Sequence, residues 1–136
     1  MKEMTESELQ TKVADYIRLQ YPKVLFHSDY GSGVKLTARQ AAIQKRQNGG
    51  LKGWPDMFIA EPFKEWHGLF IELKKDGTRL KKKDGTWASG HIAEQAKMMA
   101  ELEKRGYLAK FAVGFDEAKR IIDEYLDGPQ PERVEF

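Results

Sequence analysis

Two short apolar runs carry charge at positions where charge is costly, and they constrain the fold more than any other feature. The run "DMFIA" begins at Asp56, and "LFIELKK" begins at Leu69 after eight residues that include a proline and a glycine. Such runs, bounded by turn residues, predict neighbouring strands of one sheet. Side chains alternate between the two faces of a strand, so Glu72 and Lys74 share a face with Phe70. The alpha carbons of the two charged residues are then roughly 6–7 Å apart.

The remaining patterns predict four helices and two further strands. A capping box from Thr5 to Glu8 starts the first helix, which ends before Pro22. Gly106 ends the third helix, and Asp116 caps the fourth. The helices are expected in 5–21, within "TARQAAIQKRQNGG", in 91–105 and in 116–126, and the strands in "KVLFHSDYGSG" and "YLAKFAV". This order predicts a mixed α/β domain with a central sheet flanked by helices.

The length and composition fit one compact domain. A chain of 136 residues can build a single core, and 40% apolar with 32% charged residues is typical of a folded globular protein. We expect the domain to cover 1–126 and an acidic, proline-containing tail to cover 127–136. The motif "KKDGT" occurs twice, eight residues apart, and predicts an exposed loop or hairpin.

Several classes of protein are excluded by what the sequence lacks. No cysteine is present, which excludes disulfides, thiol catalysis and thiolate metal sites. No apolar stretch approaches the roughly 20 residues of a membrane span, and the start "MKEMTESELQ" lacks the apolar region of a signal peptide. We therefore expect a cytoplasmic protein in which any metal ion has oxygen or imidazole ligands.

Positive charge is concentrated in two segments. Five basic and no acidic residues lie between Lys35 and Lys52, and six basic residues with one acid lie between Lys74 and Lys83. A solvated polar face explains either segment alone, but two of them flanking buried charge favour a polyanionic partner such as nucleic acid. The candidate contacts with DNA are Lys35, Arg39, Lys45, Arg46, Lys52, Lys75, Arg79, Lys81, Lys82 and Lys83.

The candidate metal site is formed by Asp56 and Glu72. If the two strands pair, these carboxylates converge, and they repel one another unless a cation lets both stay ionised. Mg²⁺ suits such a site because it binds one or two carboxylates, a backbone carbonyl such as that of Leu73, and waters. Lys74 has only donors, so it can hold an attacking water or steady charge on a phosphate oxygen. The alternative is an exposed edge strand in which Glu72 and Lys74 form a minor ion pair.

Two further polar residues, Glu6 and Gln95, lie on apolar helix stripes. The stripe of Glu6 contains Leu9, Val13 and Ile17, and the stripe of Gln95 contains Ile92, Ala96, Met99 and Leu102. Each polar residue alone is also explained as a half-exposed boundary position. Together with Asp56, Glu72 and the basic segments, they favour a functional site.

The combination of "WPD" and "IELKK" resembles the signature of the PD-(D/E)xK nucleases. The Gly-x-Pro-Asp opening, the Glu-x-Lys strand and the continuation "HIAEQAKMMAELEKRGYLAKFAVGFDEA" are most similar to the virus-type replication-repair nuclease (VRR-NUC) domain. The similarity is to the small, stand-alone phage and bacterial form, and it covers nearly the whole chain except the acidic tail. It implies an α/β fold with a restriction-endonuclease-like core.

The resemblance also implies roles for individual residues. Asp56 and Glu72 correspond to the residues that bind Mg²⁺ or Mn²⁺, and Lys74 corresponds to the catalytic lysine. Glu6 and Gln95 correspond to a helix-one glutamate and to a glutamine that follows the lysine strand. Stand-alone members resemble Holliday junction resolvases, which implies a homodimer that acts on branched DNA in a bacterium or in the host of a phage.

Some residues attract attention without a clear role. His27, His67 and His91 lack a metal-binding spacing such as HExxH, so no histidine-centred metal site is expected. Trp54 and Trp87 can stack on bases or wedge a junction, although core packing is the more common use of tryptophan. Asp29 stands where related sequences often have an asparagine.

Three hypotheses follow from these patterns. The first is a metal-dependent DNA endonuclease that uses Asp56, Glu72 and Lys74, assisted by Glu6 and Gln95. The second is a DNA-binding or scaffolding module whose site is inactive. The third is a restriction-type nuclease that reads a base sequence, for which no recognition helix is evident.

Overall fold

The structure is a computed structural model, and it describes residues 3–29 and 35–128 of the chain. The helices of this part are α1 (Glu6–Gln20), α2 (Ala38–Gln47), α3 (Gly90–Lys104) and α4 (Phe115–Leu126). The strands are β1 (Phe26–Ser28), β2 (Met57–Ile59), β3 (Leu69–Lys74) and β4 (Leu108–Val113). The predicted order of elements is confirmed, whereas the glycine loop after β1 and most of the predicted tail lie outside the described residues.

The four strands form one mixed sheet in the order β1-β2-β3-β4. β2 is antiparallel to both β1 and β3, and β3 is parallel to β4. The end of β1, the start of β2 and the ends of β3 and β4 therefore lie at one end of the sheet. At this end of the sheet the chain leaves β1 and β3 to form the two basic segments.

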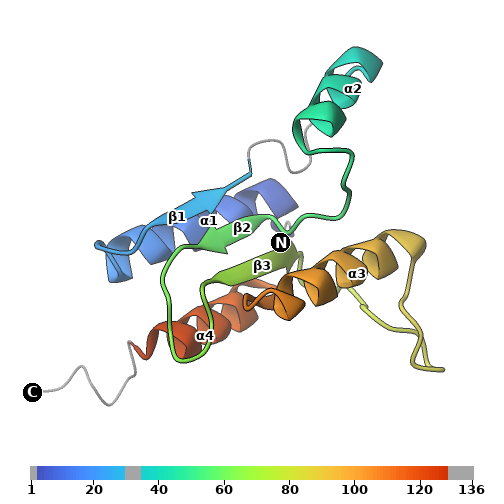
Figure 1. Ribbon diagram of the computed structural model, residues 1–136. Coiled ribbons are helices and arrows are strands. Elements are labelled where there is room, and N and C mark those ends of the chain that lie inside the picture. The colour runs from blue at the N-terminus through green and yellow to red at the C-terminus, as the bar shows by residue number, and fades with distance from the viewer. Residues whose placement is uncertain (1–2, 30–34, 129–136) are drawn as a thin grey trace, which may run out of the picture.

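The two faces of the sheet are covered by different helices (Figure 1). On one face α1 and α4 pack against the strands, and this main core contains Leu9, Val13, Ile17, Ile71 and Ile122 among its buried residues. On the other face α3 packs over β4, with Met99 and Leu102 against Ala109 and Phe70. The predicted α/β fold with a central mixed sheet flanked by helices is confirmed.

Local sequence signals account for most helix ends. The Thr5 hydroxyl accepts a hydrogen bond from the Glu8 backbone, which completes the predicted capping box of α1. After α3, Gly106 adopts a φ of 94°, a left-handed conformation that suits glycine. The predicted cap of α4 was wrong, because the helix begins one residue earlier and Gly114 occupies the capping position. Asp116 lies in the first turn instead, where its charge still complements the helix dipole.

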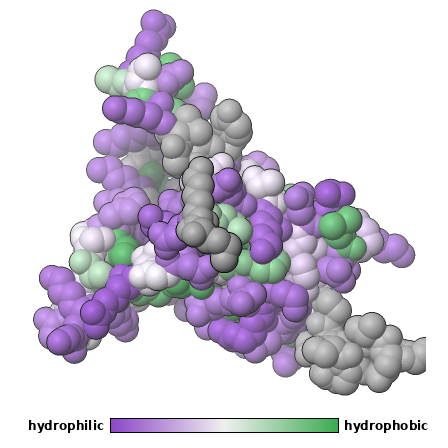
Figure 2. Space-filling model, turned by 180° about the vertical axis from the view of Figure 1, so that it is seen from behind, coloured by the Kyte–Doolittle hydropathy of each residue, from purple (hydrophilic) through white to green (hydrophobic). Residues whose placement is uncertain are grey.

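Helix α2 projects away from the rest of the domain (Figure 1). All ten of its residues are described, and none of them is buried. Its surface is mostly hydrophilic, as the projecting arm in Figure 2 shows. A helix this short is marginal in water without tertiary packing, so α2 depends on its own caps, which include a capping box from Thr37 to Gln40.

The KKDGT segment joins β3 to α3 as an exposed, hairpin-like loop, as predicted. Lys81 and Trp87 form an isolated antiparallel bridge across it, and the Lys81 ammonium lies 4.8 Å from the centre of the Trp87 ring. The described helices include none that could cross a membrane.

Candidate active site

Asp56 and Glu72 face one another across two neighbouring strands. Met57 pairs with Ile71 in the ladder between β2 and β3, and the same register continued by one residue sets Asp56 opposite Glu72. Both carboxylates thus lie at the end of the sheet where the basic segments attach. The convergence that strand alternation predicted for this pair is present in the structure.

Hydrogen bonds hold the carboxylates in place. The Leu73 backbone N–H donates to Asp56 Oδ2 at 2.8 Å, and Gln95 Nε2 donates to Glu72 Oε2 at 2.8 Å. Lys74 Nζ lies 3.6 Å from the same Glu72 oxygen. Glu72, Lys74 and Gln95 are 4%, 7% and 5% exposed, so this is a buried polar group and not an exposed edge strand.

Two oxygens of this group receive no hydrogen bond from residues 3–29 and 35–128, although the carboxyls of Glu72 and Asp56 lie within hydrogen-bond reach of each other. They are Glu72 Oε1 and Gln95 Oε1, and both are buried. Buried polar atoms in folded proteins are nearly always satisfied, so such a pair calls for a ligand. Carboxylate and amide oxygens are the donors that Mg²⁺ and Mn²⁺ prefer, and the residues present therefore fit a hard divalent cation.

The electrostatics agree with the geometry. Burial, followed by the negative charge of Asp56, raises the pKa of Glu72 to about 9, although Lys74 opposes this. Burial also raises the pKa of Asp56, against the stabilising N–H of Leu73. Without a cation, the Glu72 carboxyl is therefore protonated at neutral pH, as is usual when two buried carboxylates meet.

The backbone before Asp56 is packed closely against α3. Gly53 has a φ of 81°, and a Cβ added there would lie 2.9 Å from the Glu94 carbonyl oxygen and 3.2 Å from the Gln95 Cα. Glycine is therefore required both by conformation and by space. This contact brings the turn that carries Asp56 up to the helix turn that carries Gln95.

Glu6 is the predicted site residue for which the structure shows an electrostatic interaction with Asp56 but no hydrogen bond to it. It is the first residue of α1, it is half-buried, and its charge contributes to the raised pKa of Asp56. Among the described residues, however, no three or more His, Asp or Glu side chains form a group that could hold a metal ion. The assisting catalytic role of Glu6 thus stays a prediction.

The ten candidate DNA contacts are all exposed. The first five lie on α2 and its flanks, between β1 and β2, and the other five lie on the loop between β3 and α3. Both segments join the sheet at the end that carries Asp56 and Glu72. Their contact with nucleic acid stays a prediction.

Residues beside Asp56 were not singled out from the sequence as site residues. The backbone N–H of Asp29 donates to the Asp56 carbonyl at 2.8 Å, and Asn48, Phe58 and Asp29 line a hollow next to the Asp56 side chain. Phe58 could have been found, because strand alternation places it on the face of Asp56. The approach of Asn48, from the end of α2, has no local signal in the sequence.

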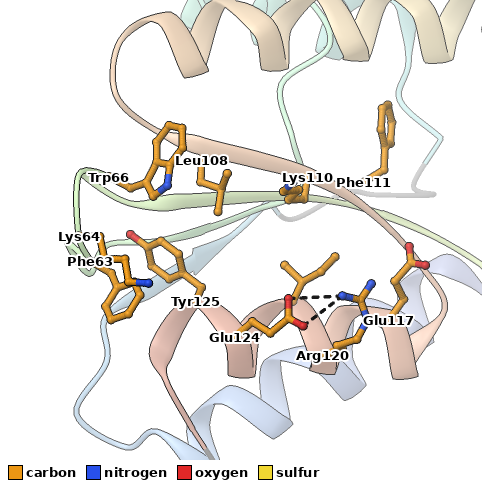
Figure 3. Close-up of a pocket in the computed structure, with 11 residues that line it drawn as sticks. Phe63, Lys64, Trp66, Leu108, Lys110, Phe111, Glu117, Arg120, Glu124 and Tyr125 are labelled. Atoms are coloured by element: carbon orange, nitrogen blue, oxygen red, sulfur yellow. Dashed lines mark hydrogen bonds and ion pairs between the residues drawn. The ribbon is translucent and has the colours of Figure 1, made fainter.

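A larger cavity of about 390 Å³ lies on the opposite face of the sheet, between α4 and β4 (Figure 3). Its walls include Trp66, Leu108 and Tyr125, and within it Arg120 and Glu124 form an ion pair at 3.4 Å. None of the residues predicted for the metal site lines this cavity. Arg120 and Glu124 of this cavity are already paired with one another, and the site at Asp56 holds the converging carboxylates, so it is the better candidate for chemistry.

Comparison with known proteins shows a similarity to solved structures. No family model matches the chain, and no curated protein matches it. A solved structure named "VRR_NUC domain protein" has 30% sequence identity to this chain and a TM-score of 0.69. The match covers 93% of this chain and 92% of the other.

The mixed sheet, its flanking helices and this match define the fold as that of a nuclease domain. The chain belongs to the VRR-NUC domain family. The resemblance that the "WPD" and "IELKK" motifs indicated is thereby confirmed over nearly the full length of the sequence.

Proposed function

We propose that the protein is a Mg²⁺- or Mn²⁺-dependent endodeoxyribonuclease that hydrolyses phosphodiester bonds of DNA. The observation that carries this proposal is the buried group of Asp56, Glu72, Lys74 and Gln95, in which two carboxyls meet and one Glu72 oxygen receives no hydrogen bond from the described residues. A purely structural ion pair would have both carboxylate oxygens satisfied. The family membership supports nuclease chemistry at this site.

Asp56 and Glu72 are the residues that would hold the cation, together with the backbone carbonyl of Leu73. In a strand, the N–H and C=O of one residue lie on the same edge, and the N–H of Leu73 already points to Asp56. When bound, the cation supplies a Lewis acid that polarises a phosphate oxygen and makes a water more acidic. Gln95 keeps the Glu72 carboxylate in place through its hydrogen bond.

Lys74 is proposed as the catalytic lysine. Its ammonium is buried, and it lies 3.6 Å from Glu72, beside the position where the phosphate would bind. From there it can hold the attacking water or donate to a phosphate oxygen that gains charge. The reaction adds one water across a P–O bond of the backbone and leaves a phosphate monoester and a free hydroxyl. Glu6 is proposed to assist from the start of α1.

The two basic segments are proposed to bind the DNA backbone. Because lysine and arginine displace condensed counterions from phosphates, affinity should fall steeply as salt is raised. Contacts of this kind position the DNA without reading its sequence.

The test is Mg²⁺- and Mn²⁺-dependent nicking by the wild type and by Glu72→Ala and Lys74→Ala. We expect each variant to bind DNA but to nick it at least about a hundredfold more slowly, the usual loss when a charge-stabilising group is removed. Lys104→Ala is a matched control, because Lys104 pairs with Glu101 on the exposed surface of α3. It should nick at the wild-type rate.

Wild-type rates in Lys74→Ala or Glu72→Ala would contradict this assignment. DNA binding without nicking by the wild type, with either metal, would instead support the inactive DNA-binding module.

The family resemblance extends the proposal to branched DNA, to a homodimer, and to work in replication, recombination or repair in the cytoplasm of a bacterium or a phage host. Leu19, near the end of α1, and Leu25, directly before the edge strand β1, are 65% and 72% exposed, so they are candidates for a subunit contact. Sedimentation of the protein alone gives the number of subunits.

A further inference from the structure

A hollow of about 270 Å³, here called the aromatic hollow, opens beside the Asp56 side chain. Its lining includes Asp29, Asn48, Trp54, Asp56, Phe58 and Phe70. It lies on the sheet face on which α3 packs mainly over β4 and the side chains of Phe70 and Glu72, towards the β1–β2 side of that face. The hollow is thus a direct neighbour of the proposed catalytic group.

Aromatic rings form much of its wall. Phe58 and Phe70 stack with their ring centres 4.4 Å apart, and Trp54 lies 6.1 Å from Phe70. Trp54 is 38% exposed, so it does not serve mainly as a core residue. A tryptophan held at the mouth of an aromatic pocket offers a flat surface on which a second ring can stack.

The polar groups of the hollow restrict what can occupy it. Asp29 and Asp56 place carboxylates at its margin, which repel a phosphate or an acidic side chain. Asn48 and His27 add side chains that can hydrogen-bond to the edge of a heterocycle. The volume lies just below the roughly 300–1,000 Å³ of ordinary ligand pockets, which suits one planar group.

We propose that the aromatic hollow receives one unpaired nucleobase, from the nucleotide next to the phosphate that is cleaved. This inference rests on the proposed nuclease function, because Asp56 belongs both to the hollow and to the metal-binding pair. Stacking on aromatic side chains with hydrogen bonds to base edges is how proteins bind single-stranded nucleic acid.

The proposal gives a physical reason for a preference for branched DNA. In an intact duplex the base must leave its stack before it can enter the hollow, and that step costs free energy. At a flap, gap or junction the base is already unpaired, so the cost is smaller. The hollow therefore selects distorted DNA without reading a sequence.

Tryptophan emission provides the first test, in EDTA so that no cleavage occurs. Titration with a short oligothymidylate should quench the emission of a Trp87→Phe background, which lacks the tryptophan of the basic loop, because a base stacks on Trp54. In this background Trp54→Phe should lose this quenching, whereas Trp66→Phe should keep it, since Trp66 lines the cavity on the opposite face. Quenching that persists in Trp54→Phe would overturn the proposal.

Cleavage provides the second test and separates the two proposals. With Mn²⁺, Trp54→Ala should lower the ratio of flap cleavage to duplex cleavage by about five- to a hundredfold, the usual loss when one stacking contact is removed. An unchanged ratio in an active enzyme would overturn the base-binding role and leave the nuclease proposal standing. Absence of cleavage by the wild type, with intact quenching through Trp54, would overturn the nuclease proposal alone.

Discussion

Two carboxylates in this domain are buried to nearly the same degree, yet their surroundings are opposite. Asp123, on α4, is 6% exposed, and its Oδ1 accepts hydrogen bonds from Tyr16 and Tyr21, each at 2.6 Å. Its other oxygen lies 3.4 Å from Lys119 Nζ. Glu72 is 4% exposed, but one of its oxygens receives no hydrogen bond from the described residues, and its nearest charged neighbours include Asp56.

The comparison shows that Asp123 is a structural carboxylate, whereas the surroundings of Glu72 favour the binding of a ligand. The Asp123 group joins α1 to α4, and burial together with the Asp123 carboxylate raises the pKa of both tyrosines, which keeps their hydroxyls protonated as donors. Around Glu72, burial and a like charge disfavour the ionised form instead. A buried group whose charge is destabilised by its surroundings is a candidate for function.

The largest expected difference is in stability. Asp123→Ala should lower the free energy of unfolding by roughly 2–4 kcal/mol, because it leaves two tyrosine hydroxyls without their charged acceptor. Glu72→Gln at pH 8 should lower it much less, because it replaces a carboxyl that is already protonated with a neutral amide that can still accept from Gln95. Urea unfolding of both variants measures the difference, and equal losses would remove the distinction between the two carboxylates.

A divalent cation should sharpen the comparison further. At a concentration about a hundredfold above its dissociation constant, Mn²⁺ should stabilise the wild type by about 2.7 kcal/mol, because only the folded protein offers the site. Glu72→Gln should lose this effect and Asp123→Asn should keep it. Thermal unfolding with and without Mn²⁺ gives the result, and a shift that survives in Glu72→Gln would place the cation elsewhere.

The dependence of stability on pH is the smallest of these effects when it is measured over a single pH unit. Because the folded-state pKa of Glu72 is raised from 4.5 to about 9, the folded protein holds a proton in this range that the unfolded chain releases. In the metal-free protein, the free energy that this bound proton contributes to folding should be present in full below pH 4.5. It should be lost as pH rises towards 9, by at most ~1.4 kcal/mol per pH unit. Asp56, whose pKa is also raised, acts in the same direction.

Unfolding measured in EDTA across this range tests the sign. The curve should be flatter in Glu72→Gln than in the wild type. Stability that rises with pH in the wild type would contradict the raised pKa of Glu72.

Much of the candidate site could be predicted because its signals are local. Strand alternation alone put Glu72 and Lys74 on one face, and the helical period put Gln95 on the buried stripe of α3, where it lies. The same reasoning placed Glu6 at the end of the α1 stripe, but that position is only half-buried. A stripe ends gradually at the first turn of a helix, so periodicity cannot decide how deeply its last member is buried.

The sequence by itself determined the order of elements, the VRR-NUC resemblance and the face on which each charged side chain lies, because caps, turns and alternation act over a few residues. Only the tertiary structure decided that Gln95 donates to Glu72, that Tyr16 and Tyr21 satisfy Asp123, and that Trp54 stands at an open hollow. These contacts join residues 23 to 107 positions apart or depend on which part of a sheet face a helix leaves uncovered. The packing of distant segments determines these contacts, and no local sequence pattern predicts them.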